Sequence, residues 1–391
     1  MIRYCVNCLY PETKPDLWFN DLGVCSACLN YQDRSKIDWI ARKREFLNIL
    51  EKYRNRNVSS YDCIIPVSGG KDSTYQVLRI LELGLNPLCV TAETDSMSDL
   101  GRRNLNNLKS LGVDHIHIMP NPVVRRKIAR LALEKIGDIQ WAEHVTIFTV
   151  PTRVAVEKQI PLIIWGENPQ NEYGGPVSET KNNILNRRWL EEFGGLLGLR
   201  VSDLIGQVGI KEQDLLPYIY PNDEAVKAVG VTGLYLGYYL PWDGYNNMLY
   251  SQANGFETYP TVVEGNLVNY ENLDNYYHGI HDYFKYLKYG FGRATDQVNN
   301  HIRRNRISRT DAVKIIEKID GKFPWTYLGR KINDILDEVD MELEEFINIC
   351  DRFTNKKIFL CDKNKKLIKD SKGNLKKLNY DNIEKLVTDK C

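Results

Sequence analysis

Short apolar runs alternate with segments of helical spacing over the first half of the chain, and this alternation constrains the fold most. The runs are YDCIIPV at 61–67, NPLCVTAE at 86–93, DHIHIM at 114–119 and PLIIWG at 161–166. Strands that alternate with helices form a parallel sheet with helices on both faces. We therefore expect an α/β domain with a parallel twisted sheet, which continues through a last strand at 231–241.

A glycine-rich loop, VSGGKDST at 67–74, lies between the first expected strand and a helix expected over 72–84. Gly69 and Gly70 let the backbone approach anionic oxygens, and the helix N-terminus adds partial positive charge. A Walker A loop needs a further glycine upstream and a hydroxyl directly after its lysine, but Asp72 stands in the latter place. The loop therefore predicts phosphate binding by a motif other than Walker A.

The polar side chains of this loop indicate how it meets a nucleotide. Ser68 and Ser73 add hydroxyl donors, and Lys71 either reaches the phosphates or points to solvent. A carboxylate repels phosphate, so Asp72 either holds a metal ion, caps the helix or orients the loop.

Nine cysteines in one chain need an explanation, and four of them match a four-thiolate zinc site. These four are Cys5, Cys8, Cys25 and Cys28. Two C-x-x-C knuckles complete a closed tetrahedron, whereas a redox dithiol normally occurs once within a βαβ unit. Cys63 and Cys89 fall in expected strands, where a thiol is a small core side chain. We expect structural Zn²⁺ at the N-terminus.

Charge and hydropathy argue against two classes of partner. The 52 basic and 51 acidic residues leave a net charge of +1, so the whole chain carries no electrostatic footprint for nucleic acid. No stretch approaches the ~20 apolar residues that span a bilayer, and MIRYCVNC does not read as a signal peptide. We expect a cytoplasmic protein that binds neither nucleic acid nor membrane.

The loop SGGKDS at 68–73 resembles the SGGxDS loop of the PP-loop ATP pyrophosphatases, which include GMP synthetase, asparagine synthetase and tRNA thiolation enzymes. This resemblance implies a PP-loop, HUP-like fold that binds ATP, with Mg²⁺, and cuts it between the α and β phosphates. A substrate oxygen is then adenylated, and a nitrogen or sulfur nucleophile displaces AMP.

Further stretches resemble one branch of this superfamily, the N-acetyl sugar amidotransferases of the WbpG and PseA type. They are YCVNCLYPETKPDLWFNDLGVCSAC at 4–28, WGENP at 165–169, LGYYLPWDGYNN at 236–247 and GIHDYFKYLKYGFGRATDQVNNHIRRNRISRTDAV at 279–313. The resemblance implies that the acetamido oxygen of a sugar attacks the α-phosphate of ATP. Ammonia then expels AMP and leaves an acetamidino group, in the synthesis of bacterial surface polysaccharide or flagellin glycan.

The ammonia for such a reaction has no evident source in the chain. No cysteine directly follows Met1, and no later cysteine lies in a G-x-C-x-G elbow with an attendant histidine. The resemblance therefore implies a separate glutaminase subunit as partner. It implies an N-acetylated sugar or nucleotide-sugar as substrate.

Polar residues directly after the expected strands are candidates for the site, because ligands bind at the carboxyl ends of strands in open α/β sheets. Glu167 and Asn168 follow the strand LIIW, with loop capping as the alternative. Glu93 and Asp95 follow the second strand and are expected to contact adenosine or metal. The expected catalytic residues are Lys71, Asp72, Glu167 and Asn168.

A second group of residues suits a sugar, whose apolar face stacks on an aromatic ring while its hydroxyls need polar partners. This group is Trp242, Asp243, Tyr245, Asn246, Arg293 and His281, with an ordinary turn and helix cap as the alternative around Asp243. Arginine matches anionic oxygens, so Arg293 suits a nucleotide-sugar or carboxylate, unless it lies on a solvated helix face. His278 and His281 lack a third placed ligand and are expected to be a packed or hydrogen-bonded pair rather than a metal site.

We expect four regions: a zinc-binding ribbon over 1–36, a PP-loop domain with a linking helix over 37–250, a helical substrate or partner region over 251–355, and a basic hairpin or tail over 356–391. Two other functions stay open. A tRNA-thiolating PP-loop enzyme calls for catalytic cysteines near the nucleotide and a basic RNA surface. A non-catalytic nucleotide-binding subunit of a glutaminase complex does not need an intact SGGKDS loop.

Overall fold

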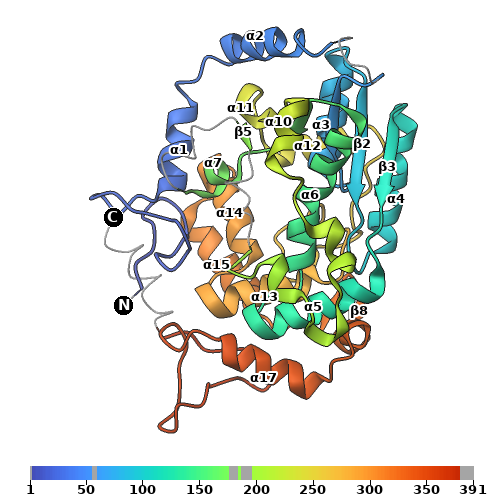
Figure 1. Cartoon of the computed structure of the whole chain (residues 1–391). Coiled ribbons are helices and arrows are strands. Elements are labelled where there is room, and N and C mark those ends of the chain that lie inside the picture. Colours follow the sequence, from blue (N-terminus) through green and yellow to red (C-terminus); the bar gives the residue numbers. More distant parts are fainter. Residues whose placement is uncertain (1, 55–59, 176–183, 186–195, 379–391) are drawn as a thin grey trace.

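The centre of the protein is a six-stranded sheet, seen in a computed structural model that describes residues 2–54, 60–175, 184–185 and 196–378 (Figure 1). The strand order is β3-β2-β1-β4-β6-β5. The strands are β1 (Cys63–Pro66), β2 (Pro87–Ala92), β3 (Asp114–Ile118), β4 (Leu162–Trp165), β5 (Ile184–Leu185) and β6 (Thr232–Tyr235). β1, β2, β3, β4 and β6 are parallel, and β5 pairs antiparallel with β6. The predicted α/β class is confirmed.

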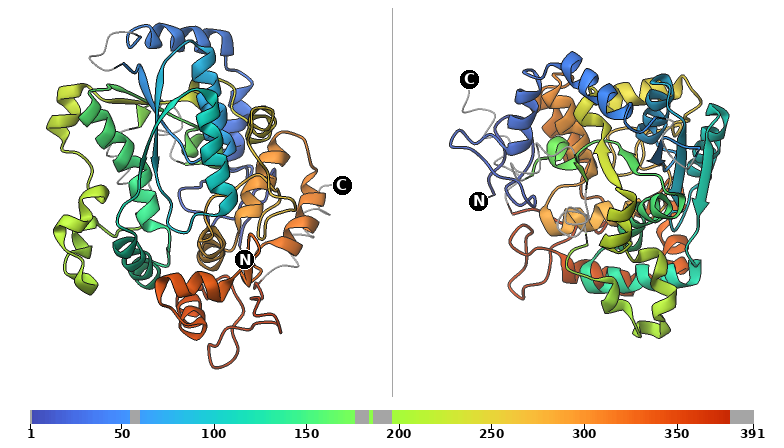
Figure 2. Two further views of the ribbon diagram at one scale, coloured as in Figure 1. Left: turned by 90° about the vertical axis from the view of Figure 1, so that its right-hand side faces the viewer. Right: turned by 45° about the horizontal axis from the view of Figure 1, so that its top comes forward.

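Helices cover both faces of the sheet (Figure 2), which explains why the central strands β1 and β4 are apolar, whereas the edge strand β3 carries polar residues and is partly exposed. Along β1, Cys63 and Ile65 pack on the side of α2 (Trp39–Leu50) and α3 (Lys71–Glu82), while Ile64 packs on the side of α6 (Trp141–Lys158). Alternate residues of one strand therefore feed two separate hydrophobic clusters.

The strand expected at 231–241 is too long and is corrected by the structure. The chain leaves the sheet after β6 and forms the short helix α11 (Leu236–Tyr239). Tyr239 stacks on Phe46 of α2 with ring centroids 4.8 Å apart. Apolar residues of this segment enter the hydrophobic clusters on both faces of the sheet, so its apolar run has no period that separates strand from helix.

Further helices surround the sheet and build the remaining regions. Those of the first 252 residues are α1 (Ser26–Arg34), α4 (Asp99–Asn107), α5 (Pro122–Ile136), α7 (Pro169–Tyr173), α10 (Asp223–Val229) and α12 (Gly244–Gln252). Short 3-10 helices cover Leu108–Leu111, Val201–Leu204, Gln207–Gly209, Glu212–Tyr218 and Asp337–Val339. Among the described residues, no helix is long and apolar enough to cross a membrane.

The helical C-terminal region that the sequence predicts is present, but it starts at His278 and not at 251, since residues 253–277 contain no helix. Its elements are α13 (His278–Tyr289), α14 (Arg293–Arg303), α15 (Arg309–Ile319), β7 (Thr326–Tyr327), β8 (Arg330–Lys331), α16 (Ile332–Leu336) and α17 (Leu343–Phe353). Ser308 caps α15, since its Oγ accepts a hydrogen bond from Asp311 N at 3.1 Å. The buried faces of α13, α16 and α17 share one hydrophobic cluster.

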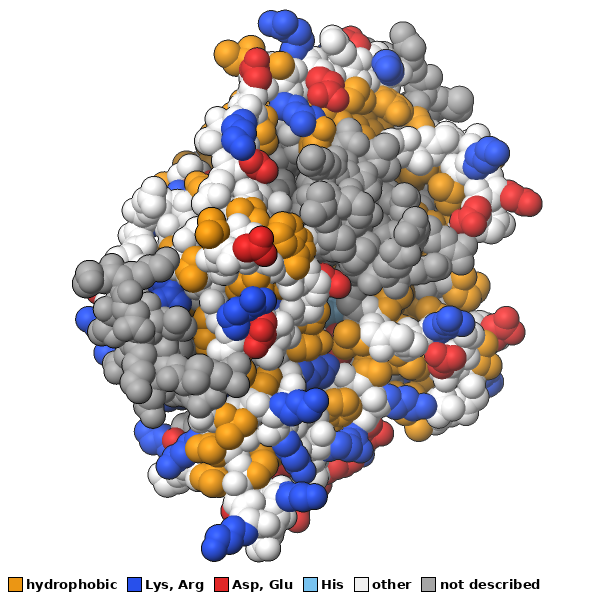
Figure 3. Space-filling model, turned by 90° about the vertical axis from the view of Figure 1, so that its left-hand side faces the viewer, with side chains coloured by type: hydrophobic (Ala, Val, Ile, Leu, Met, Phe, Trp, Pro, Cys, Tyr) orange, Lys and Arg blue, Asp and Glu red, His pale blue; other side chains and the backbone are white. Residues whose placement is uncertain are grey.

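The C-terminal segment after α17 carries many exposed lysines. Antiparallel bridges join Phe359 to Lys377 and Lys369 to Leu375, and Gly373 turns the chain at φ +83°. Lys and Arg side chains gather at the lower end of the face in Figure 3, where this segment lies in Figure 1. The end of the expected tail, 379–391, lies outside the described residues.

Candidate active site

The glycine-rich loop joins β1 to α3, and its shape depends on the absence of a side chain at Gly69. Gly69 has φ +83°, and a Cβ there would lie 2.6 Å from the backbone nitrogen of Leu105 in α4. Gly70 is the N-cap of α3. The loop backbone is thus pressed against α4 and leads directly into a helix N-terminus, an arrangement that suits anion binding.

The hydroxyl groups of Ser68 and Ser73 hold the backbone of this loop in place. Gly70 N donates to Ser68 Oγ at 3.3 Å, and Ser73 Oγ donates to Gly70 O at 3.0 Å. Ser68 and Ser73 line a cavity of about 230 Å³ at the carboxyl ends of β1, β2 and β4, which we call the loop cavity. Both serines therefore lie where the sequence places a phosphate.

A second, strongly polar cavity adjoins the first, and we call it the polar cavity. Its walls come from the loop, from α7 and from the segments 242–245, 268–271 and 297–306. Asp72 and Glu167 line both cavities. These two carboxylates therefore lie at the junction between the loop cavity and the polar cavity.

Lys71 lies at the centre of a chain of buried charges. Its Nζ lies 2.6 Å from Asp72 Oδ2 and 3.3 Å from Glu271 Oε1, and Glu271 Oε2 accepts from Arg293 Nη2 at 2.9 Å. Burial opposes the charge of Glu271, but Lys71 and Arg293 outweigh it and lower the pKa of Glu271 to about 2. Lys71 therefore points toward the cavity rather than to solvent, held by two carboxylates.

Glu167 has the opposite electrostatic environment. Burial and the neighbouring charge of Asp72 raise the pKa of Glu167 to about 7. A carboxyl group with this pKa exchanges a proton near neutral pH. Asn168 is buried beside it and starts α7, where its carbonyl accepts from Glu172 N at 3.2 Å. The alternative role, capping at the end of the loop, is therefore filled by the backbone carbonyl of Asn168.

The residue that positions Asp72 is Asn247, one place beyond the expected Asn246. Asn247 is buried in α12 and donates from Nδ2 to Asp72 Oδ1 at 2.8 Å, whereas Asn246 is exposed. Ser251, one turn further, donates to the carbonyl of Lys71 at 2.7 Å. α12 therefore braces the start of α3.

Charged residues form the rim of the polar cavity around Asp243. Asp243 caps α12 through Tyr245 N at 3.3 Å and binds Arg306, with Nη1 to Oδ1 at 3.0 Å. Burial opposes ionisation, but the hydrogen bond from Arg306 and the charge of Arg304 lower the pKa of Asp243. Arg304 also lies 3.2 Å from Glu172. The rim is consequently an ionised network.

Aromatic rings lie on either side of this network. Trp242 is 4% exposed and packs edge-on against Tyr75 at 5.6 Å, so its ring belongs mainly to the core. Tyr245 is 39% exposed, and the guanidinium of Arg306 lies 4.9 Å from its ring centroid. Of these two rings, Tyr245 is the one available for stacking.

The structure does not bring Glu93 and Asp95 into the loop cavity. Glu93 pairs with His117 at 2.9 Å, and Asp95 is buried against Arg125. The residue between them, Thr94, lines the loop cavity and donates to Glu143 Oε2 at 2.6 Å. Successive side chains of an extended segment point to opposite sides, so the side chains of Glu93 and Asp95 point away from the cavity that Thr94 lines.

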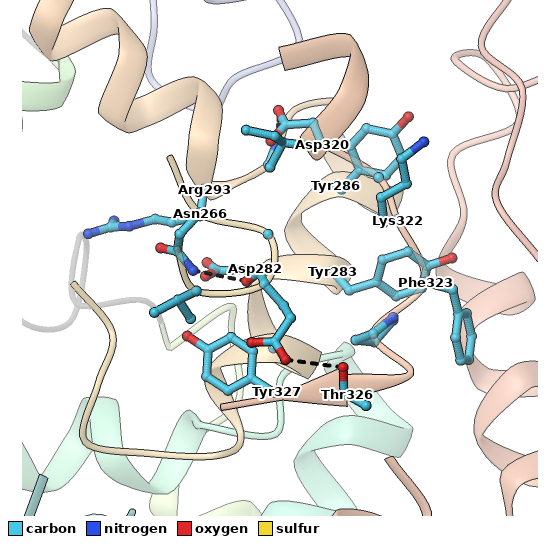
Figure 4. Close-up of a pocket in the computed structure, with 18 of the residues that line it drawn as sticks. Asn266, Asp282, Tyr283, Tyr286, Arg293, Asp320, Lys322, Phe323, Thr326 and Tyr327 are labelled. Atoms are coloured by element: carbon cyan, nitrogen blue, oxygen red, sulfur yellow. Dashed lines mark hydrogen bonds between the residues drawn. The ribbon is translucent and has the colours of Figure 1, made fainter. Parts of the chain in front are cut away.

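Two of the expected sugar residues also lie elsewhere. His281 contacts Asp138, with Nδ1 2.9 Å from Oδ1. Arg293 binds Glu271 behind the polar cavity and borders a separate aromatic cavity of about 460 Å³ (Figure 4). In Figure 4 the walls of that cavity are Tyr283 and Tyr286 of α13 and the segment that carries Phe323 and Tyr327.

The four expected zinc ligands converge. All four Sγ atoms of Cys5, Cys8, Cys25 and Cys28 lie within 4.8 Å of one another, with Cys5 to Cys28 at 3.9 Å and Cys8 to Cys25 at 3.6 Å. A tetrahedral ion with bonds of about 2.3 Å has ligand atoms about 3.8 Å apart. Backbone N–H groups of Asn7 and Cys25 donate to Cys5 Sγ. The donor set and spacing fit Zn²⁺.

The carboxylate of Asp72 fits Mg²⁺, which takes carboxylate oxygens together with the phosphate oxygens of a nucleotide.

Sequence reasoning missed Glu271, Asn247 and Glu143. Glu271 lies in the stretch 256–275, which is part of the expected helical region but contains no helix, and it meets Lys71 across 200 residues of chain. No local signal marks it. The position of Asn247 follows from the phase of α12, a helix that the sequence indicates only through the possible cap around Asp243.

Comparison with known families identifies one segment of the chain. Residues 256–372 match the family model described as "LPS biosynthesis protein WbpG-like, C-terminal domain". This segment includes Glu271, Arg293 and Arg304 of the site. The chain has no matching relative among curated proteins.

Two solved structures are similar to part of the fold. NMN synthetase from Francisella tularensis is 13% identical, with 56% of this chain and 94% of that chain covered and a TM-score of 0.28. An NH3-dependent NAD synthetase from Campylobacter jejuni subsp. jejuni NCTC 11168, in complex with the nitrate ion, is 12% identical, with 58% and 100% covered and a TM-score of 0.29. With identities and TM-scores this low, no activity or substrate is transferred from either structure to this chain.

Proposed function

We propose, from the match of residues 256–372 to the WbpG-like C-terminal domain model, that the chain is the synthetase subunit of an ATP-dependent amidotransferase. It converts the acetamido group of a sugar into an acetamidino group for a surface polysaccharide. The observation that carries the proposal is the position of Asp72 and Glu167, which line both the loop cavity and the polar cavity. ATP occupies the first cavity, and the acetamido group of the sugar reaches the second, which has a volume of only about 40 Å³ and holds no whole sugar ring.

The loop provides for the nucleotide. Pyrophosphate is held by backbone N–H groups at the start of α3, by the hydroxyls of Ser68 and Ser73, and by Lys71. Lys71 is pre-positioned by Asp72 and Glu271, so its charge needs no reorganisation as pyrophosphate leaves. Mg²⁺, when bound at Asp72, would supply further neutralisation of the phosphates.

The polar cavity provides for the acceptor. Tyr245 offers an exposed ring for the apolar face of a sugar, and His301, Arg304 and Arg306 offer donors for hydroxyl or anionic oxygens. A nucleotide-linked or carboxylated sugar suits this basic rim better than a neutral one.

The chemistry balances in two steps. The acetamido oxygen attacks the α-phosphorus, pyrophosphate leaves, and the amide N–H proton passes to a base, which gives an O-adenylyl imidate. Ammonia then adds to the imidate carbon, AMP leaves with its oxygen, and a proton is lost. Glu167, with a pKa of about 7 and a position at the junction, is the base.

The proposal extends to the regions of the chain and to its partner. The ribbon 1–36 is a structural zinc module, 37–250 binds ATP, 251–355 contributes acceptor and partner contacts, and 356–391 is a basic appendage. Ammonia comes from a separate glutaminase subunit in the cytoplasm.

A tRNA-thiolating enzyme is disfavoured by the described cysteines. Cys63 and Cys89 are fully buried in the sheet, and burial raises the pKa of both thiols. No described cysteine lines the loop cavity or the polar cavity. A catalytic thiol needs thiolate character and access, which these lack.

The test is incubation with ATP, Mg²⁺, ammonium chloride and a panel of free and nucleotide-linked acetamido sugars. We expect one sugar to support release of AMP and pyrophosphate and to lose about one dalton as oxygen is replaced by NH. ADP formation, or AMP formation that depends on tRNA and a sulfur donor instead of a sugar, would overturn the proposal. Absence of nucleotide turnover with every sugar would favour a non-catalytic subunit.

A further inference from the structure

We propose that Asp138, His144 and His281 form a second metal site, which binds a divalent first-row transition ion and is distinct from the four-cysteine cluster. Asp138 lies in the turn after α5, His144 in α6 and His281 in α13. The sequence alone pairs His281 with His278, three residues away, and provides no third ligand. The fold instead supplies two ligands from elements far away in the chain.

The donor atoms have the separations that one ion requires. Asp138 Oδ1 lies 2.9 Å from His281 Nδ1, Asp138 Oδ2 lies 3.2 Å from His144 Nδ1, and all the donor atoms lie within 4.8 Å of one another. Nitrogen and oxygen ligands at about 2.1 Å from a tetrahedral ion are about 3.4 Å apart. The two imidazole rings stand edge to face at 5.1 Å, so neither blocks the other's approach.

A hydrogen-bonded cluster explains these contacts only in part. His144 Nδ1 is buried and faces Asp138 Oδ2 at 3.2 Å, but the angle at the ring nitrogen is poor for a hydrogen bond. A contact that is poorly aligned gains less than a full hydrogen bond, and a metal ion would use the lone pair of this nitrogen.

The neighbouring group of Glu143, Asp274 and His278 shows the contrast. Both nitrogens of His278 have partners, with Nδ1 3.1 Å from Gln140 and Nε2 3.1 Å from Asp274. Glu143 Oε2 accepts from Thr94 at 2.6 Å and from Asn275 at 2.5 Å. That group is satisfied as a hydrogen-bond network, so the proposal is restricted to the group around Asp138.

The surroundings of Asp138 support a ligand role. The carboxylate is buried, and Gln140 N donates to Asp138 Oδ1 at 3.0 Å, a contact of the kind that orients metal-bound carboxylates. The imidazoles are 25% and 28% exposed, so an ion can enter from solvent and keep water in its remaining positions.

The donor set selects the class of ion. Two imidazoles and one carboxylate suit Zn²⁺, Co²⁺, Fe²⁺ or Mn²⁺, and Zn²⁺ is commonly held by three protein ligands and water. The ion would join α6 of the sheet domain to α13 of the C-terminal region. It would lie beside Glu143, which lines the loop cavity.

Cobalt titration of the metal-stripped full chain tests this site. We expect two equivalents of Co²⁺ to bind: one with the near-ultraviolet charge-transfer band of thiolate ligands, and one with weak visible bands alone. His281→Asn and Asp138→Asn should each lose the second equivalent and keep the thiolate band, which also reports that the variant is folded. Asp138→Asn retains an oxygen that can accept from Gln140 N.

His115→Asn is the matched control, since His115 stacks on His117 in β3 and contacts Thr91 instead of a carboxylate. It should bind both equivalents. Saturation of the wild type at the thiolate equivalent, or a second equivalent that both cluster variants retain, would overturn the proposal. Neither result depends on the proposed amidotransferase activity, because metal content is the readout.

Discussion

At the scale of single residues, two carboxylates with opposite environments define the site. Glu271 lies between Lys71 and Arg293 and is held ionised, whereas Glu167 lies beside Asp72 and is held near its titration point. Pairs of carboxyl groups whose environments push their pKa values apart are typical of acid–base chemistry. Glu271 organises charge, and Glu167 moves a proton.

Replacing Glu167 by Gln should lower the rate of AMP formation by about 10²–10⁴-fold, the usual contribution of a general base. In the wild type, kcat/KM should rise as pH passes through about 7 and then level off, because the base is the ionised form. Rates measured from pH 5.5 to 8.5 check this. A variant that keeps the same pH profile would contradict the role of Glu167.

The same substitution should stabilise the free protein at high pH. The pKa of Glu167 is raised from 4.5 to about 7 in the folded state, so its contribution to stability is full below pH 4.5 and is lost as pH rises through 7. Glu167→Gln removes the buried charge and should raise Tm at pH 8 by about 1–4 °C, with a smaller gain at pH 5. Glu172→Gln, which deprives Arg34 and Arg304 of a partner, should lower Tm instead.

Glu271→Gln should destabilise the protein with the opposite pH dependence. The pKa of Glu271 falls from 4.5 to about 2 on folding, so its stabilising contribution is present above pH 4.5 and is lost as pH falls toward 2. We expect a loss of about 2–4 kcal/mol in the free energy of unfolding at pH 7, and a smaller loss at pH 3.

Urea unfolding at both pH values measures this difference. Glu45→Gln, which breaks an exposed pair with Arg42, is the control and should change stability by less than about 0.5 kcal/mol. An equal loss for Glu271→Gln at pH 7 and pH 3 would refute the ionised network around Lys71.

At the scale of elements, the join between β1, the loop and α3 rests on α4. Gly69→Ala adds a Cβ that meets Leu105 N at 2.6 Å and also strains a backbone at φ +83°. We expect a cost of at least about 2 kcal/mol and loss of ATP binding, measured by thermal unfolding and equilibrium dialysis.

Gly112→Ala separates the two causes of that effect. Gly112 has φ +78°, but a Cβ there meets nothing within 4 Å. It should show the backbone cost alone, about 1 kcal/mol, and bind ATP normally. If both variants lost ATP binding equally, contact with α4 would not shape the loop.

The elements also show what the sequence could predict. The strands and the loop follow from local patterns, since apolar runs and glycines act on their immediate neighbours. The buried position of Asn247 could not be predicted, because the phase of α12 is set by its packing against α3 and not by its own weakly patterned residues. Glu271 and the partners of His281 depend on contacts between distant segments, which no local pattern encodes.

At the scale of the whole molecule, the N-terminal cysteine cluster is tied to the C-terminal region. Leu9 N donates to Asn299 Oδ1 at 2.8 Å, Tyr10 OH donates to Asp296 at 2.8 Å, and Arg309 Nε donates to the carbonyl of Cys8 at 3.1 Å. The cluster therefore supports α14, which carries Arg293, and α15.

Removal of zinc should loosen both ends of this contact. Cys8→Ser, or chelation, should speed hydrogen exchange in residues 4–28 and also in 293–312, because α14 and α15 lose their support. Cys361→Ser, outside the cluster, should leave exchange in both segments unchanged. Faster exchange confined to residues 4–28 would show that the ribbon is an independent unit.

The central claim is that a sugar amide oxygen is transferred to the α-phosphate of ATP. A panel of acetamido sugars labelled with oxygen-18 in the carbonyl, incubated with the protein, ATP, Mg²⁺ and ammonium chloride, tests it directly. We predict AMP heavier by about two daltons, in equal amount to a sugar product lighter than its unlabelled parent by about one dalton. Unlabelled AMP alongside the amidine product would contradict adenylation of the amide.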